Sequence, residues 1–188
     1  MINGKRILGF TVAVLLCVTP ACRRPAVRTE IRRPETQAGQ TNITGRVVRI
    51  ADGDTLTVLD AANLQHRIRL QGIDAPESHQ AFGTQSKQNL SALVFDKEVT
   101  AVCDKADQYG REVCKIVLDG RDINLEQVKA GMAWHYKDYQ REQSPEDREL
   151  YARAENEARA ARRGLWIDAN PTEPSEFRKE EKRERQAR

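Results

Sequence analysis

The chain has 188 residues, of which 31% are charged, 39% hydrophobic and 5% aromatic. A chain of this length can bury one good core, so one folded domain is the default, and the low aromatic share argues against a large aromatic binding surface. The 31 Lys and Arg against 28 Asp and Glu leave a formal net charge of +3, and this total alone gives no evidence of a polyelectrolyte tether to nucleic acid. Any affinity for phosphate must come from local placement of charges.

The first 22 residues differ in composition from the rest of the chain. Lys5 and Arg6 precede an apolar run over residues 7–18, and the small residue Ala21 closes the segment. These features are typical of a signal peptide. Twelve apolar residues are too few to span a bilayer core comfortably, so a retained membrane anchor is the weaker interpretation. We therefore predict that residues 1–22 direct the protein to the bacterial cell envelope (periplasm) or into the medium.

Two further features lie between the leader and the folded domain. Cys22 directly follows Ala21, so a lipoprotein with a lipid anchor at Cys22 is the alternative fate of the leader. Thr19 stands where bacterial lipoprotein signals usually carry an aliphatic residue, which favours plain secretion. Residues 23–41 combine Arg, Pro, Thr, Gln and Gly with little apolar content, which predicts a flexible linker. The folded domain is expected over residues 42–168.

Five segments of this domain carry the apolar and β-branched pattern of strands. They are residues 45–50, 55–59, 65–73, 99–103 and 112–118. A tight turn over residues 52–54 joins the first two, and Gly53 permits the positive φ that such a turn often needs. In the third strand Ile68 and Leu70 share one face, so Arg69 points away from the apolar side.

Three helices are predicted among these strands, over residues 84–95, 123–130 and 144–164. The third is the best marked, because Ser144 can cap it and Pro145 suits its first position. Its apolar face is expected at Leu150, Ala154, Ala158 and Ala161. Leu165 and Trp166 are expected to fold back onto the domain.

The last residues, 169–188, mix basic and acidic side chains with almost nothing apolar. This composition predicts a charged tail that is disordered or a frayed helix. Contact between the tail and nucleic acid is a weaker alternative, because its acidic residues nearly cancel its basic ones.

Two cysteines belong to the domain, Cys103 and Cys114, on either side of a turn-like segment. In an oxidising compartment they could form a disulfide between neighbouring strands. Two unpaired thiols packed as small apolar residues are the alternative, and both interpretations stay open. Metal binding by this pair is poorly supported, because no further Cys or paired His accompanies it.

The order of strands and helices matches an OB-fold, a five-stranded Greek-key β-barrel with three helices, of the α+β class. Five motifs occur in order along it: Asp52-Gly53-Asp54-Thr55, Arg69 through Glu77, Tyr109-Gly110-Arg111, Gly131-Met132-Ala133-Trp134 and Gly164-Leu165-Trp166. With these motifs the chain resembles the staphylococcal nuclease-like, or thermonuclease, family over about residues 42–168. The resemblance implies an OB-fold nuclease.

The resemblance also implies a calcium site. It assigns Asp54 and Asp74 as carboxylate ligands and the backbone carbonyl of Ala75 as a third ligand. Two adjacent carboxylates repel each other unless a cation lies between them, and oxygen ligands suit a hard ion such as Ca²⁺. Taken alone, Asp54 would be read as a turn residue.

The remaining site residues are also assigned by the resemblance. Glu77 matches the general base that positions or deprotonates the attacking water, with His79 a less favoured base. Arg69 and Arg111 match the arginines that hold the phosphate, a role that suits planar guanidinium groups. Tyr109 matches a tyrosine that lines the nucleotide pocket.

We therefore expect a monomeric, Ca²⁺-dependent nuclease that hydrolyses DNA, prefers single strands and leaves 3′-phosphate ends, and the sequence leaves open whether RNA is also a substrate. The alternative from another class is a non-catalytic OB-fold module of the cell envelope that binds nucleic acid or peptide. A third interpretation, an envelope structural or lipoprotein interaction domain, draws only on the leader and Cys22. Neither alternative explains why carboxylates and arginines occur together in these motifs.

Overall fold

A computed structural model describes residues 40–187 of the chain. The predicted signal peptide, the lipid site at Cys22 and all but the end of the predicted linker lie outside the described residues. Export and lipidation therefore stay predictions. Within residues 40–187 no helix combines the length and the apolar character that crossing a bilayer requires.

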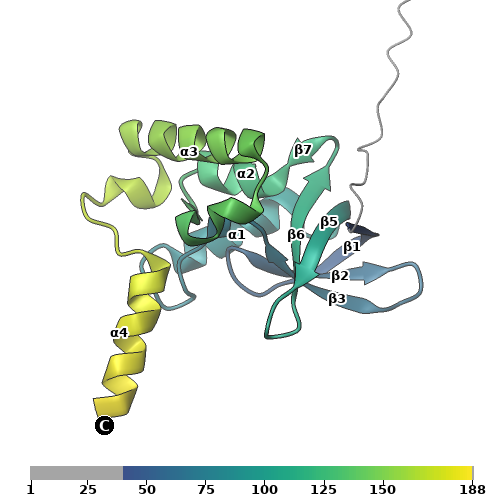
Figure 1. Cartoon of the computed structure of the whole chain (residues 1–188), viewed down its shortest axis with the longest axis horizontal. Coiled ribbons are helices and arrows are strands. Elements are labelled where there is room, and N and C mark those ends of the chain that lie inside the picture. The colour runs from purple at the N-terminus through teal and green to yellow at the C-terminus, as the bar shows by residue number, and fades with distance from the viewer. Residues whose placement is uncertain (1–39, 188) are drawn as a thin grey trace, which may run out of the picture. The chain divides into compact units, whose positions relative to one another are not determined.

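Along the described chain, four strands precede the first helix and three more precede the second, and the C-terminal part is mainly helical (Figure 1). The strands are β1 (Thr41–Ile50), β2 (Thr55–Asp60), β3 (Gln65–Leu70), β4 (Ile73–Asp74), β5 (Glu98–Ala106), β6 (Glu112–Leu118), β7 (Arg121–Asp122) and β8 (Trp134–His135). The α-helices are α1 (Gly83–Val94), α2 (Ile123–Lys129), α3 (Pro145–Ala160) and α4 (Pro174–Ala187). Two 3₁₀ helices follow β8 and α3, η1 (Lys137–Glu142) and η2 (Gly164–Ile167).

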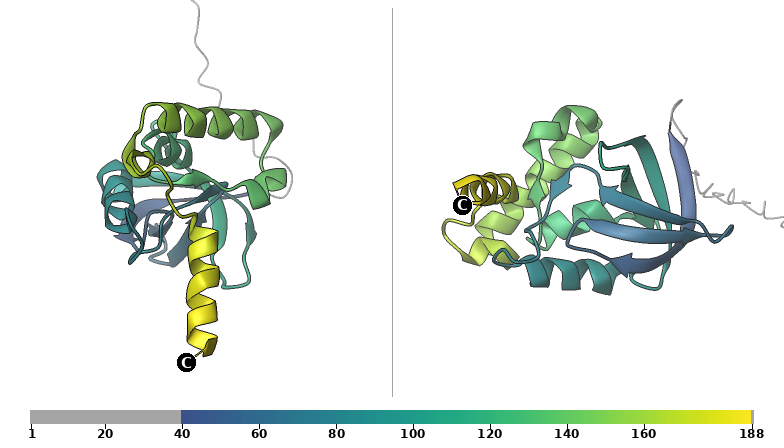
Figure 2. Two further views of the ribbon diagram at one scale, coloured as in Figure 1. Left: turned by 90° about the vertical axis from the view of Figure 1, so that its left-hand side faces the viewer. Right: turned by 90° about the horizontal axis from the view of Figure 1, so that it is seen from below.

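The five long strands form a closed barrel. Antiparallel pairing gives the order β3-β2-β1-β5-β6, and β3 also pairs with β6 in parallel, which closes the sheet on itself. The helices α1, α2 and α3 gather to one side of this barrel (Figure 2). The prediction of a five-stranded OB-fold barrel, with helices after the third and fifth strands, is confirmed. The short strands β4, β7 and β8 were not predicted.

The barrel is filled by the inward side chains of its strands and closed by helical residues. Val47, Leu56 and Ile68 are fully buried inside it, and Leu90 and Val94 of α1 join the same core. A smaller cluster under η2 consists of Trp134, Ala158, Leu165 and Trp166. As predicted, residues 165 and 166 fold back onto the domain.

Helix α3 begins as predicted, and its buried face is the predicted one in part: Ala154 and Ala158 are buried, whereas Leu150 and Ala161 are exposed. The Ser144 side chain caps it by accepting from the backbone N–H of Asp147 at 3.0 Å. The buried residues are Tyr151, Ala154, Glu155 and Ala158, whereas the predicted Leu150 is exposed. The helix is rotated because Tyr151 offers a larger apolar surface, and its hydroxyl donates to Asp122 at 2.8 Å.

The C-terminal segment is helical, which is one of the two alternatives that its composition left open. Residues 174–187 form α4, whose i,i+3 and i,i+4 ion pairs include Lys179 with Glu176 and Arg185 with Glu181. Such pairs support a helix that lacks an apolar stripe. Side chains of its first two turns also contact the rest of the domain, which gives this helix a tertiary support that its composition does not reveal.

Candidate active site

The turn between β1 and β2 fixes the first predicted carboxylate. Asp52 Oδ1 accepts from the backbone N–H of Asp54 at 3.0 Å, and Gln127 Nε2 donates to the carbonyl of Gly53 at 2.7 Å. A Cβ at Gly53 would lie 1.8 Å from Ser86 Oγ, so no larger residue fits. Gly53 does not have the positive φ that the sequence predicted. Glycine is needed here for space, and the result is an immobilised, buried Asp54.

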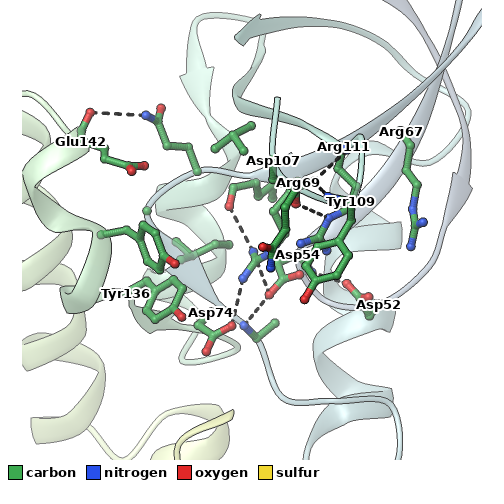
Figure 3. Close-up of a pocket in the computed structure, with 18 of the residues that line it drawn as sticks. Asp52, Asp54, Arg67, Arg69, Asp74, Asp107, Tyr109, Arg111, Tyr136 and Glu142 are labelled. Carbon is green, nitrogen blue, oxygen red and sulfur yellow. Dashed lines mark hydrogen bonds and ion pairs between the residues drawn. The ribbon is translucent and has the colours of Figure 1, made fainter. Parts of the chain in front are cut away.

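One arginine joins the two predicted metal ligands. Arg69 on β3 forms ion pairs at 2.9 Å with Asp54 Oδ2 and, through its other terminal nitrogen, with Asp74 Oδ1. Asp54 Oδ2 also accepts from the backbone N–H of Ala75 at 2.6 Å. All three charged side chains are largely buried, with side-chain exposures of 8%, 2% and 13% for Asp54, Asp74 and Arg69. Figure 3 shows the arginine between the two carboxylates. Segments that lie apart in the sequence therefore bring these three charged side chains together.

The electrostatics of this cluster favour an added cation. Burial raises the pKa of Asp54 to about 8, against the lowering effect of Arg69, and the nearby charges of Asp52 and Asp74 raise it further. A carboxylate in such surroundings is stabilised by a positive partner. Two carboxylates and the adjacent Ala75 carbonyl form an all-oxygen donor set, the kind that Ca²⁺ prefers. The residues present therefore fit a calcium ion.

Glu77 lies beside this cluster rather than within it. Within residues 40–187, the carboxylate oxygens of Asp54, Asp74 and Glu77 do not all lie within 4.8 Å of one another, and side chains that meet this distance are found at Cys103, Glu112 and Cys114. The position of Glu77 therefore suits a general base better than a third carboxylate ligand of a metal ion. Its backbone N–H donates to Gln80 Oε1 at 3.1 Å, and its side chain accepts from Arg178 Nη1 at 2.9 Å.

The second predicted arginine is positioned by a residue that the sequence analysis missed. Arg111 Nε donates to Asp107 Oδ2 at 2.7 Å, while Asp107 Oδ1 accepts from the backbone N–H groups of Tyr109 and Arg111. Gly110 completes this loop with a φ of 71°, which favours glycine. Because Nε is engaged, the outer nitrogens of Arg111 remain the groups that can face a ligand. The sequence did contain a signal for this contact, because Asp107 lies four residues before Arg111 in a turn that contains a glycine.

These residues line one cleft of about 760 Å³. The carboxylates, Glu77, Arg69, Arg111 and Arg67 all contribute to its wall, and Tyr109, with 70% exposure, stands at its edge. Tyr136 and Tyr139 line the cleft too, with ring centroids 4.9 Å apart. In Figure 3, Tyr136 and Tyr109 lie on opposite sides of the carboxylate–arginine cluster.

The two domain cysteines are joined. Cys103 on β5 and Cys114 on β6 are direct register partners and form a disulfide with an S–S distance of 2.11 Å. This is one of the two alternatives that the sequence left open. Because both sulfurs are in the bond, their proximity to Glu112 does not make a metal site. The bridge lies at the base of the loop that carries Arg111.

The structure thus brings every predicted site residue except His79 to the same cleft. His79 lies outside it and contacts α4, through an ion pair with Glu181 at 2.7 Å. Sequence reasoning missed Asp107, Gln127 and Arg178. The first two position predicted residues, and Arg178 comes from the charged C-terminal segment, to which the sequence analysis gave no part in the site.

Comparison with known proteins agrees with this geometry. The family described as Staphylococcal nuclease homologue matches residues 67–168. An uncharacterized endonuclease of Haemophilus influenzae is 46% identical over 182 residues, which cover 97% of this chain and 89% of that protein. The micrococcal nuclease of Shigella flexneri is 42% identical over 148 residues, or 73% of this chain and 82% of the relative.

A plant relative gives a similar identity, but this chain covers less of that relative. A probable staphylococcal-like nuclease of Oryza sativa is 40% identical over 122 residues, or 65% of this chain and 32% of that protein. Helix α4 lies beyond the residues that the family match covers.

Proposed function

The chain belongs to the staphylococcal nuclease family and is a nuclease, and we propose that it cleaves phosphodiester bonds in a Ca²⁺-dependent reaction. One observation carries the proposal. A single guanidinium, that of Arg69, bridges the two buried carboxylates Asp54 and Asp74 at the mouth of a cleft that also contains Glu77 and Arg111. A module that only binds nucleic acid has no need of this costly arrangement of buried charges.

The cation would be held by Asp54, Asp74 and the carbonyl of Ala75. When bound, Ca²⁺ would supply positive charge against the charge that develops on the phosphate. Asp54 is well suited, because its burial makes an isolated negative charge unfavourable. The immobilised turn around Gly53 keeps this carboxylate in place.

The catalytic roles follow from how each side chain is held. Glu77, partly exposed and hydrogen-bonded at its backbone to Gln80, can accept a proton from a water that attacks the phosphorus. Arg111 is oriented through Nε by Asp107, so that its outer nitrogens can donate to phosphate oxygens. Arg69 adds a second guanidinium at the same end of the cleft. Expulsion of the 5′ oxygen would leave a 3′-phosphate, the outcome that the family resemblance implies.

We further propose that the substrate is single-stranded DNA, and RNA as well, bound by a monomer. Tyrosines on both sides of the cleft can contact the sugars and bases of an unpaired strand. Export from the cytoplasm rests on residues 1–22 alone.

The test is end-group analysis of the products. Purified protein is incubated with Ca²⁺ and 5′-labelled oligonucleotides of single-stranded DNA, duplex DNA or RNA, with Glu77→Gln as the control. The proposal predicts 3′-phosphate fragments whose gel mobility changes after phosphatase treatment, fastest from single strands. Fragments with 3′-hydroxyl ends would contradict the proposed chemistry, and binding of all three substrates without cleavage would favour the non-catalytic module.

A further inference from the structure

Helix α4 places an arginine, Arg178, on two carboxylates of the proposed site, Asp74 and Glu77. Arg178 Nη2 donates to Asp74 Oδ2 at 2.9 Å, and Arg178 Nη1 donates to Asp74 Oδ1 at 3.2 Å. The same Nη1 donates to Glu77 Oε1 at 2.9 Å. One guanidinium from the C-terminal segment therefore holds both a proposed cation ligand and the proposed base.

This contact occupies the oxygen atoms that a cation would need. Asp74 Oδ1 already accepts from Arg69, and Arg178 takes a position on both Oδ1 and Oδ2. Asp74 is only 2% exposed, so other approaches to its oxygens are few. A divalent ion on Asp74 would lie beside the guanidinium groups of both Arg69 and Arg178, and positive groups at such distances repel strongly. Arg69 is largely buried and is also held by Asp54, whereas Arg178 comes from a surface helix, so Arg178 is the arginine that can leave. Arg178 and the ion are alternatives for this carboxylate.

The helix that carries Arg178 is attached over a small area. Phe177 contacts the His79 ring with centroids 5.2 Å apart, and Glu181 pairs with His79 at 2.7 Å. Pro174 is its one buried residue. Residues 182–187 are exposed and extend away from the barrel (Figures 1 and 2). A helix held by one face of its first two turns can withdraw without disturbing the barrel core.

We propose that Arg178 and a divalent cation compete for Asp74, so that α4 keeps the site closed until the cation displaces the arginine. This inference rests on the proposed function, because it presumes that Asp74 is a cation ligand. Arg178 leaves both Asp74 and Glu77 when the cation binds, which frees the base at the same moment. Calcium thus has two effects: it supplies charge to the site and it opens the site.

The experiment is calorimetric titration of Ca²⁺ into the full chain, for wild type, Arg178→Gln and Arg183→Gln. Arg183 is exposed in the outer half of α4, so Arg183→Gln removes the same charge from the same helix without touching the site. If α4 is closed nine-tenths of the time, the apparent affinity of wild type is reduced by roughly tenfold. Arg178→Gln should therefore bind Ca²⁺ roughly tenfold more tightly, and Arg183→Gln should match wild type.

Hydrogen exchange gives a second readout that is independent of activity and of the variants. In wild type, backbone amides of residues 175–181 should exchange faster with Ca²⁺ than without it, whereas those of α3 should not change. Equal Ca²⁺ affinity in wild type and Arg178→Gln, with unchanged exchange in α4, would overturn the competition and leave the proposed function intact. Weaker Ca²⁺ binding by Arg178→Gln would also overturn the competition, because it would show that Arg178 supports the site while the cation is bound. Failure of every protein to bind Ca²⁺ would contradict the proposed function as well.

Discussion

The barrel side of the cleft and the α4 side both present charged groups, but they are anchored differently. On the barrel side, Asp54, Arg69 and Asp74 are buried and bonded to one another and to the backbone. On the α4 side, Glu77 and Arg178 have side-chain exposures of 31% and 39%, and their ion pair joins a loop to a surface helix. The barrel side holds its charged side chains in fixed positions, whereas the charged side chains on the α4 side can move. Substitutions on the two sides should therefore differ in what they damage.

The largest effect is expected for Arg69→Gln, because it damages both catalysis and stability. Loss of one donor to the transition state costs about 10²- to 10³-fold in rate. Asp54, left buried without its ion-pair partner while Asp74 keeps Arg178, should also lower the free energy of unfolding by about 3 to 5 kcal/mol. Cleavage assays and urea unfolding measure the two losses.

Arg67→Gln is the matched control, since Arg67 lies on the same strand and lines the same cleft but is exposed. It should lose little in either measurement. Equal effects of the two substitutions would contradict the special position of Arg69.

Glu77→Gln should damage catalysis alone. Removing the base should slow cleavage by about 10²- to 10⁴-fold. Because Glu77 is partly exposed and its loop is held by backbone contacts, the free energy of unfolding should stay within about 0.5 kcal/mol of wild type. A variant that keeps more than a tenth of the activity would remove Glu77 from the reaction.

Removal of the disulfide tests whether the stability of the barrel depends on this covalent link. The bridge between Cys103 and Cys114 spans 11 residues, and closing such a loop in the unfolded chain is worth about 3 kcal/mol. The double variant Cys103→Ser with Cys114→Ser should be less stable by about that amount in urea unfolding. Its activity under native conditions should remain close to that of wild type, and a large loss of activity would show that the bridge positions the Arg111 loop.

The smallest effect is expected from a histidine on the barrel. His66 contacts Asp60 at 3.0 Å and Glu112 at 3.2 Å, and the hydrogen bond with Asp60 outweighs burial and raises its pKa above the usual 6.5. Its stabilising effect is therefore complete below pH 6.5 and is lost as the pH rises through the raised pKa.

Urea unfolding of wild type and His66→Gln between pH 5.5 and about 9 measures this effect. Their difference in stability should be greatest at low pH and should shrink as the pH rises. A difference that is constant with pH would show that His66 contributes through packing alone.

Sequence reasoning located the barrel side well and the α4 side poorly, for physical reasons. Strands and turns of the barrel follow local alternation, and the Asp54 and Asp74 loops adjoin strands that must pair. The role of Gly53 was misassigned, because its requirement comes from Ser86, a residue far along the chain. Arg178 lies about a hundred residues from its partners Asp74 and Glu77. The charged sequence of α4 has no periodic pattern that would distinguish Arg178, which contacts the site, from the exposed arginines of the same helix.

The most direct test of the account is the rate of single-stranded DNA cleavage as Ca²⁺ is titrated, in wild type and in Asp74→Asn. The account predicts a saturable rise in wild type that chelator abolishes, and no response to Ca²⁺ in Asp74→Asn. A wild-type rate that is the same with Ca²⁺ and with chelator would contradict it.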